Sequence, residues 1–304
     1  EDDELARLAD EPLGEHAWRE IAARVCARER DACVERARLL GLAVAPADAP
    51  REAPASWLRI AAHGPSAAPR PLAAPLVVDL SSLWAGPLAA RLLRIAGARV
   101  VKVEATRRPD GARRGNAAFF DRLNAGKASV ALDFAECEGV ARLRALLERA
   151  DVVIESARPR ALRQLGIDAE AWVRAQPGRV WLSITGYGRA APGSDWIAFG
   201  DDAAAAAGLC WCVPTGAPLL VGDAIADPLA GLHGALAAQR CWRRGEGALL
   251  DVALSGVVAH AIANAGAARE PCPAPVARPP RLLGAAPPRA RALGADTRAE
   301  LGIA

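Results

Sequence analysis

The sequence predicts an α/β fold built on a doubly wound parallel sheet. From residue 76 onward, short apolar runs of strand length alternate with amphipathic segments of helical period. The runs are apolar on both faces, as in residues 76–80 (LVVDL) and 151–156 (DVVIES), which is typical of parallel strands covered by helices on both sides. Ligands of such sheets bind beyond the carboxyl ends of the strands, so the loops that follow the strands are the places to search for function.

The elements follow one another in a regular order. The first unit is a strand, a helix closed by Gly97, and a second strand, and the same pattern then repeats. Strands are expected at residues 76–80, 98–104, 127–134, 151–156, 179–188 and 248–254, with helices at 87–97, 137–150, 160–177 and 227–244 and one more after 254.

The two ends of the chain differ from this middle region. Residues 1–74 are expected to form a helical segment followed by a proline-rich stretch, which is either a linker or an extended arm. Residues 75–265 predict one large domain. Residues 266–304 are again rich in proline and predict a tail that wraps a surface without forming its own core.

Composition excludes several classes of protein. There are 38 Lys and Arg residues against 35 Asp and Glu residues, and a net charge of +3 argues against a nucleic-acid or membrane partner. The seven cysteines form no CxxC pair, so neither a zinc ribbon nor a disulfide framework is predicted. His233 is too isolated for a transition-metal site, and no metal is expected. A cytoplasmic protein is the resulting expectation.

Two loops after predicted strands favour an anionic ligand. Residues 81–87 (SSLWAGP) lead into a helix, whose N-terminus attracts phosphate, although an ordinary turn explains them too. The GxGxxG pattern of dinucleotide-binding proteins is absent. Residues 102–127 combine several Lys and Arg residues with two phenylalanines, which suits phosphates and a flat base, and a solvated loop explains them equally well.

A pair of carboxylates precedes a run of alanines. Asp201 and Asp202 stand directly before five alanines, and Asp223 and Asp227 follow within a short distance in sequence. One acid can cap the helix while the other points into a cleft, or both can serve as caps. No GxSxG motif supports serine-hydrolase chemistry.

Together these segments resemble the class III CoA-transferases, the family that includes formyl-CoA transferase and α-methylacyl-CoA racemase. The resemblance covers residues 76–262 and is carried by VVDLSSLWAGPLAARLLRIAGARVVKVE, RLNAGKASVALDF, DVVIESARPRALRQLGID, WLSITGYG, GDD and GDAIADPLAGLHGALAA in that order. It implies a Rossmann-like large domain, a small domain that is reduced here, and an interlocked homodimer. It also implies coenzyme A, bound as an acyl-CoA substrate, and a small carboxylic acid.

The resemblance also implies a covalent mechanism. In these transferases an aspartate attacks the thioester and forms an aspartyl-acyl anhydride. The family motif matches residues 198–202 (AFGDD) with an ambiguity of one position, so Asp201 is the favoured nucleophile and Asp202 the alternate. Asp227 matches an aspartate of an A-D motif that transferases and racemases share. Gly200 stands where the racemases have a histidine, which disfavours two-base racemase chemistry.

The resemblance further predicts where CoA binds. Contacts are expected from the 81–87 loop (Leu83, Trp84, Ala85), the cationic segment (Lys102, Arg107, Arg108), the NAGK turn (Asn124, Lys127) and residues 156–166 (Ala157, Arg158, Ala161, Arg163). The glycine-rich loop that covers the transferase active site has no counterpart here. The alternatives are therefore a racemase or lyase of the same superfamily, or a CoA-binding subunit that has lost catalysis.

Overall fold

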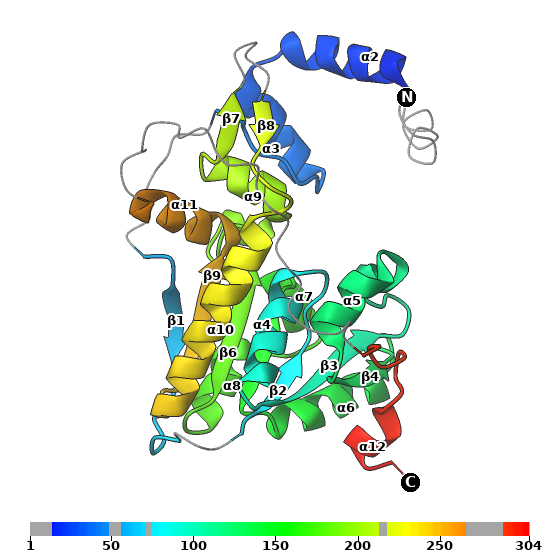
Figure 1. The fold of residues 1–304 in the computed structure, drawn as a ribbon, viewed down its shortest axis with the longest axis vertical. Helices are drawn as coiled ribbons and strands as arrows, with labels where there is room; N and C mark the ends of the chain where they lie inside the picture. The colour runs from blue at the N-terminus through cyan, green and yellow to red at the C-terminus, as the bar shows by residue number, and fades with distance from the viewer. Residues whose placement is uncertain (1–13, 49–55, 71–73, 213–217, 266–287, 304) are drawn as a thin grey trace.

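A seven-stranded sheet organises the computed structural model, which describes residues 14–48, 56–70, 74–212, 218–265 and 288–303. The strand order is β1-β9-β6-β5-β2-β3-β4, and β1 is antiparallel to β9 while the other neighbours are parallel (Figure 1). This confirms the predicted α/β class. The strands are β1 Arg59–His63, β2 Leu76–Asp79, β3 Arg99–Ala105, β4 Ala128–Leu132, β5 Val152–Glu155, β6 Val180–Thr185 and β9 Ala248–Ala253.

Helices cover both faces of the sheet. Side chains along β6 alternate between the two layers: Leu182 belongs to the core under α4, α10 and α11, and Trp181 to the core under α6 and α8. The helices and short helical turns are α2 Glu15–Cys26, α3 Arg30–Leu39, α4 Ala85–Ile95, η1 Gly111–Arg114, α5 Ala117–Asn124, α6 Cys137–Glu148, α7 Pro159–Gln164, α8 Ala169–Ala175, η2 Gly193–Asp195, α9 Gly200–Ala206, α10 Ala226–Arg244, α11 Leu254–Asn264 and α12 Thr297–Leu301.

The order of strands sets where a ligand can bind. From strand β2 the chain builds outward on one side through β3 and β4, and on the other through β5, β6 and β9. The connections after β2 and β5 therefore leave in opposite directions, and sheets of this kind bind ligands at such a point, beyond the carboxyl ends of the strands. One hydrogen bond joins these two loops, from the Ser82 amide to the Ser156 hydroxyl at 3.2 Å.

The segment expected as one helix over residues 160–177 forms two helices instead. Gly166 adopts a left-handed conformation (φ +67°) and ends the first helix. Asp168 then caps the second, because its carboxylate accepts hydrogen bonds from the amides of Glu170 (2.8 Å) and Ala171 (3.1 Å). The apolar period continues across the break, which is why periodicity alone does not reveal it.

The proline-rich stretch before residue 75 contains a strand. β1 lies there and pairs with β9 at the edge of the sheet, so residues 59–63 act as an extended arm rather than a free linker. The prolines stand outside the strand, where the absence of an amide hydrogen costs no ladder bond. Residues 1–13 and 49–55 of the predicted N-terminal segment lie outside the described residues.

The described part of the C-terminal tail covers the opposite edge of the sheet. Asp296 accepts a hydrogen bond from the Ser129 amide (2.9 Å), and Thr297 accepts one from the Ala131 amide (3.0 Å). These side chains satisfy edge amides of β4 that have no neighbouring strand. Residues 266–287 and 304 of the tail are outside the described residues. Within the described ranges, no helix combines the length and the apolar character needed to cross a membrane.

The carboxyl edge also carries two smaller elements. A hairpin of β7 (Cys210–Cys212) and β8 (Pro218–Leu220) follows α9, and α3 lies at the same end of the molecule, in the upper part of Figure 1. Contacts from α3 reach the loop after β6, since Arg38 stacks on Trp196. The N-terminal segment thus helps to build the region where a ligand is expected.

Candidate active site

Three carboxylates meet where α9 and α10 begin. Asp201 and Asp202 lie in the first turn of α9, and Asp227 lies in the first turn of α10. The two helix starts touch at Gly200, where an added Cβ would lie 2.3 Å from an oxygen of Asp227 and 2.4 Å from the carbonyl oxygen of Ala224. A side chain at position 200 would clash with Asp227 and Ala224, so the close approach of the starts of α9 and α10 requires glycine there.

Asp227 is the most perturbed of the three acids. Its pKa is raised from the usual 3.8 to about 6: burial is the largest cause, the Ala85 amide partly opposes it, and the negative charges of Asp201 and Asp202 add to the increase. That amide donates a hydrogen bond of 3.3 Å to Asp227. A carboxyl with a pKa near 6 changes its charge close to neutral pH, which is a property of many functional acids.

Asp202 has both carboxylate oxygens engaged. One accepts a short hydrogen bond from the Phe199 amide (2.6 Å), which caps α9, and the other accepts from the Tyr187 hydroxyl (3.1 Å). Burial raises the pKa of Asp202, and these two donors oppose the increase. The Tyr187 pKa is raised to about 12, chiefly by burial and then by the charge of Asp202. Tyr187 therefore remains a donor to this carboxylate over the ordinary pH range.

Asp201 is less constrained. Its Oδ1 accepts a hydrogen bond from the Ala224 amide at 2.8 Å. Among the residues that the structure describes, no donor to its second oxygen is found. Ala224 itself has a left-handed backbone (φ +45°), so the loop before α10 is held in a strained conformation as it meets Asp201. The arrangement splits the pair of acids into a cap, Asp202, and a carboxylate with fewer hydrogen-bond partners among the described residues, Asp201.

The 81–85 loop lies beside this cluster. Leu83 is a non-glycine residue with positive φ (+68°) and a partly exposed side chain, and Trp84 packs edge-on against Phe119 with 5.1 Å between ring centroids. Ala85 begins α4 and is the residue whose amide reaches Asp227. The loop predicted for CoA contacts and the acids predicted for catalysis are therefore brought together.

Two buried lysines anchor the two ends of the 81–87 segment, Lys102 at Ser81 and Lys127 at Pro87. The Lys127 ammonium pairs with Asp79 (2.8 Å) and also donates to the Pro87 carbonyl (3.0 Å) and to the Asn124 side chain (2.9 Å). The Lys102 ammonium pairs with Asp110 (2.9 Å) and donates to the Ser81 carbonyl (2.8 Å). Lys102, Asn124 and Lys127 are each no more than 3% exposed. Their polar groups are thus directed to protein partners.

Burial acts strongly on the Lys127–Asp79 pair. Burial lowers the pKa of Lys127 to about 8, although Asp79 works against that shift. The pKa of Asp79 is lowered: burial is the largest single influence and acts to raise it, but the attraction of Lys127 and Lys102 and two side-chain hydrogen bonds together outweigh it. We assign the pair as ionised, since each charge has several partners in place of water.

The other predicted cations are distributed over the surface. Arg107 pairs with Asp133 (2.9 Å) and Arg163 with Glu170 (3.6 Å), while Arg108 is exposed. Arg158 lies before the first residue of α7, and Ala157 and Ala161 are on either side of it in the same segment. Arg107, Arg108 and Arg158 remain accessible to a ligand, in contrast to the lysines.

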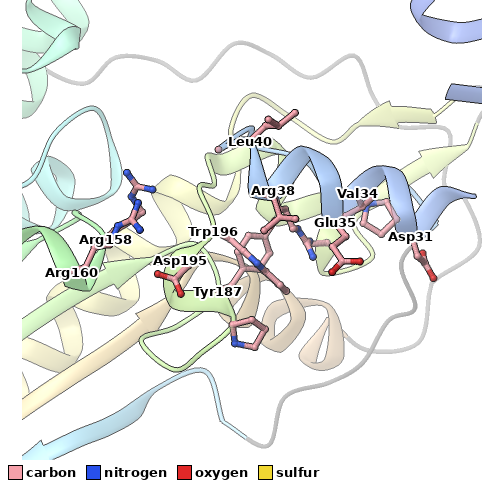
Figure 2. A pocket seen from close by; sticks show the side chains of 15 residues that line it. Asp31, Val34, Glu35, Arg38, Leu40, Arg158, Arg160, Tyr187, Asp195 and Trp196 are labelled. Carbon is pink, nitrogen blue, oxygen red and sulfur yellow. The ribbon is translucent and has the colours of Figure 1, made fainter. Parts of the chain in front are cut away.

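A large cavity is lined by Tyr187, the residue whose hydroxyl donates to Asp202. It has a volume of about 1130 Å³ and lies between α3 and the segment 187–196, with Arg158 and Arg160 at one side (Figure 2). Tyr187 and Ala206 line it, so it lies against the face of α9 that carries Asp202. Sequence reasoning missed the α3 wall, because nothing in the pattern of residues 30–39 indicates which part of the sheet they approach.

A buried ion pair that the sequence did not reveal supports the loop after β6. Arg189 pairs with Glu155 at 2.8 Å, and the Trp181 indole donates to the same carboxylate at 3.0 Å. Burial raises the pKa of Glu155 even though Arg189 opposes the shift. The side chains of Arg189 and Glu155 are 6% and 2% exposed. This buried pair therefore fixes the loop that carries Tyr187 to the end of β5.

Within the described residues, no group of three or more His, Cys, Asp or Glu side chains has the geometry to hold a metal ion.

The segment that carries the three carboxylates matches a known protein family. A family model, CoA-transferase family III, matches residues 72–288, which is most of the chain. The chain belongs to CoA-transferase family III. The match includes the sheet from β2 onward, the 81–85 loop and all three carboxylates.

Characterised relatives in this family include transferases and a racemase. A succinate–glutarate CoA-transferase of Agrobacterium fabrum is 32% identical over 213 residues, covering 64% of this chain and 53% of the relative. A human α-methylacyl-CoA racemase is 36% identical over 112 residues, covering 37% of this chain and 27% of the relative. A solved CaiB/BaiF family protein from Brucella suis has 31% identity and a TM-score of 0.58, covering 64% of this chain and 56% of that one.

The chain spans about half the length of the Agrobacterium transferase and of the Brucella protein.

Proposed function

We propose that the protein transfers CoA from an acyl-CoA thioester to a carboxylic acid through an aspartyl-acyl anhydride on Asp201. The observation that carries the proposal is the cluster of Asp201, Asp202 and Asp227 beside the 81–85 loop, in a chain of CoA-transferase family III. Asp201 is favoured over Asp202 because Asp202 already uses both oxygens to hold Phe199 and Tyr187.

The chemistry requires three exchanges at carbonyl carbons. First, an oxygen of Asp201 bonds to the thioester carbonyl, the C–S bond breaks, and the electron pair leaves with CoA as thiolate. The acceptor carboxylate then attacks the aspartyl carbonyl and displaces the first acid, giving a second anhydride. Finally the thiolate attacks the acceptor carbonyl and releases the Asp201 carboxylate. Together these steps replace one difficult direct exchange by several easier ones.

The neighbouring acids have supporting parts in this proposal. Asp202 fixes the start of α9 and thereby the direction of Asp201. Asp227, with a pKa of about 6, is largely protonated in mildly acidic solution and then adds no negative charge to the cluster. A neutral neighbour lowers the electrostatic cost of bringing an acceptor carboxylate to Asp201.

CoA is proposed to bind along the carboxyl edge of the sheet. The 83–85 residues would contact its pantetheine arm near Asp227, and exposed cations would contact its phosphates. Lys102, Asn124 and Lys127 would act indirectly by holding the loop. The proposed contacts are Leu83, Trp84, Ala85, Arg107, Arg108, Ala157, Arg158, Ala161 and Arg163.

We further propose that the protein works as a homodimer in the cytoplasm. Exposed apolar side chains at the ligand end of the molecule, Leu39, Leu40, Leu219 and Leu220, are each more than half exposed and suit a protein interface. The free thiols among the described cysteines suit a reducing compartment.

A second candidate is a CoA-binding protein without transfer activity. Asp201 and Asp202 each accept a backbone amide, which accounts for both residues structurally. Racemase chemistry has less support, because two bases must face one α-carbon and the residue next to Asp227 is Gly200.

Trapping of the anhydride separates the candidates. The protein is incubated with succinyl-CoA and hydroxylamine, digested, and analysed by mass spectrometry. Transfer predicts a hydroxamate on Asp201 that Asp201→Asn abolishes and that Asp202→Asn retains. An unmodified Asp201 together with retained CoA binding in calorimetry would favour the binding protein. Exchange of the α-proton in deuterated water without transfer would favour racemisation.

A further inference from the structure

Arg189 lies two residues after Tyr187 and is anchored in the sheet. Its guanidinium pairs with Glu155 at the end of β5 (2.8 Å) and donates to the Ser183 hydroxyl on β6 (3.0 Å). Its backbone amide donates to the carboxylate of Asp251 on β9 (3.1 Å). One residue of this loop therefore joins the carboxyl halves of three neighbouring strands.

The register of the sheet places the three partners of Arg189 in one row. Glu155 is opposite Ser183, and Ser183 is opposite Asp251. Residues that are opposite one another in adjacent strands point to the same face of a sheet, so Arg189 lies along the row and bonds to each strand in turn. Helices separate β5, β6 and β9 in the sequence, and the row exists only in the folded protein.

Stability alone does not explain this row of polar side chains. Glu155 Oε2 and Asp251 Oδ1 are buried and have no hydrogen-bond partner among the described residues. An unsatisfied buried acceptor costs free energy, and a buried ion pair often stabilises a protein no more than well-packed apolar side chains of similar volume. The distinctive contribution of Arg189 is fixed geometry, because a planar guanidinium reaches several partners in only one orientation.

The loop that Arg189 anchors carries Tyr187 to the start of α9. Between the two residues stands Gly188, whose backbone is left-handed (φ +93°) and whose amide donates to the Thr185 hydroxyl (2.8 Å). The Tyr187 hydroxyl in turn donates to Asp202 in the first turn of α9 (3.1 Å). A tight turn of one residue therefore connects the anchor in the sheet to the donor that holds Asp202.

We propose that Arg189 is a positioning residue of the transfer reaction. It fixes Tyr187, whose hydroxyl holds Asp202, and Asp202 sets the direction of Asp201 at the start of α9. In this role Arg189 acts through Tyr187 and takes no part in making or breaking bonds. The inference rests on the proposed transfer reaction, and it extends the site to a residue that the sequence did not single out.

A spectroscopic test needs no catalysis, because Tyr187 is the single tyrosine of the chain. Tyrosine labelled with carbon-13 at Cζ gives one NMR signal at neutral pH, and Asp202→Asn shows how that signal moves when the carboxylate acceptor is lost. Arg189→Lys should displace the signal in the same direction, since an ammonium lacks the planar fork of donors. Arg179→Lys, which changes an arginine only 3% exposed directly before β6, should leave it in place. An unmoved signal in Arg189→Lys, or an equal displacement in Arg179→Lys, overturns the proposal.

Kinetics connect this geometry to the reaction. With succinate as acceptor, Arg189→Lys is expected to lower kcat about tenfold and to keep the KM for acyl-CoA within about twofold of wild type, because a misplaced nucleophile slows the chemical step. Tyr187→Phe should lower kcat similarly, and the double variant should be no slower than Tyr187→Phe, since both changes act on one hydrogen bond. Effects that multiply in the double variant, or an equal loss of kcat in Arg179→Lys, overturn the proposal.

The two measurements separate failure of this inference from failure of the transfer reaction. If wild type forms no hydroxamate while Arg189→Lys displaces the Tyr187 signal, the transfer reaction fails and the placement of Tyr187 by Arg189 stands. If wild type forms the hydroxamate and Arg189→Lys keeps the wild-type signal and kcat, transfer stands and the positioning role is refuted. Glu155→Gln weakens the same anchor and provides the test if Arg189→Lys does not fold: a smaller displacement in the same direction supports the proposal, and an unmoved signal refutes it.

Discussion

Replacing Asp227 by Asn should change how protein stability depends on pH. In the folded protein the pKa of Asp227 is raised from 3.8 to about 6, mainly by burial. Between these pH values the folded state holds a proton that the unfolded state has released, so wild-type stability falls as pH rises. A shift of roughly two pKa units corresponds to about 3 kcal/mol, which is the largest effect expected once Asp227 is fully ionised.

The difference between variant and wild type isolates this group. Urea unfolding is followed at intervals from about pH 4 to about pH 7 for Asp227→Asn and for wild type, at constant ionic strength. The free energy of unfolding of the variant, minus that of wild type, should increase by up to about 3 kcal/mol over this range. Asp223→Asn, which removes an exposed carboxylate four residues earlier, controls for the loss of an acid without burial. A difference for Asp227→Asn that stays constant, or that grows toward low pH, would refute the reasoning.

Two further substitutions test the packing and the ion pairs around the site. Gly200→Ala places a methyl group 2.3 Å from Asp227 and 2.4 Å from the Ala224 carbonyl, so it should destabilise the protein by roughly 1–3 kcal/mol. Gly256→Ala in α11 is its control, because the nearest atom lies at 3.5 Å and the change should be neutral or slightly stabilising; equal effects of the two in chemical unfolding would contradict the close approach. Lys127→Met leaves Asp79 buried without its partner and should cost about 3–5 kcal/mol, measured by urea unfolding. Arg142→Met, which breaks an exposed pair with Glu138, should cost no more than about 0.5 kcal/mol, and a similar loss in both variants would show that the buried pair has no special importance.

The sequence predicts the sheet well because its strands are unambiguous. Residues 76–80 and 151–156 are short, apolar and β-branched, and helices of regular period separate the strands, so local pattern and overall fold agree. The strand β1 is missed because its sequence, RIAAH, lies among prolines and pairs only with the distant β9. The break between α7 and α8 is missed because the apolar period continues across Gly166, whose left-handed backbone ends the first helix.

The candidate site is predicted in its members and only partly in its geometry. The sequence identifies Asp201, Asp202 and Asp227, yet their separate environments depend on tertiary contacts with Tyr187, Ala224 and Ala85. The burial of Lys102 and Lys127 also depends on carboxylates from other strands and loops, which a pattern of basic residues does not reveal. The contact of Arg38 on α3 with Trp196 was not expected, since it joins distant parts of the chain.

Transfer of an oxygen atom to Asp201 tests the central claim most directly. If the acceptor carboxylate forms an anhydride with Asp201, one of its oxygens bridges the two carbonyl groups and stays on the aspartate when the thiolate attacks the acceptor carbonyl. Succinate labelled with oxygen-18 in both carboxylates is therefore incubated with acyl-CoA and protein, and the peptide that contains Asp201 is analysed by tandem mass spectrometry. The account predicts oxygen-18 in the Asp201 side chain only when acyl-CoA is present, and none in Asp202. Transfer of CoA to succinate with no label in Asp201 would contradict it.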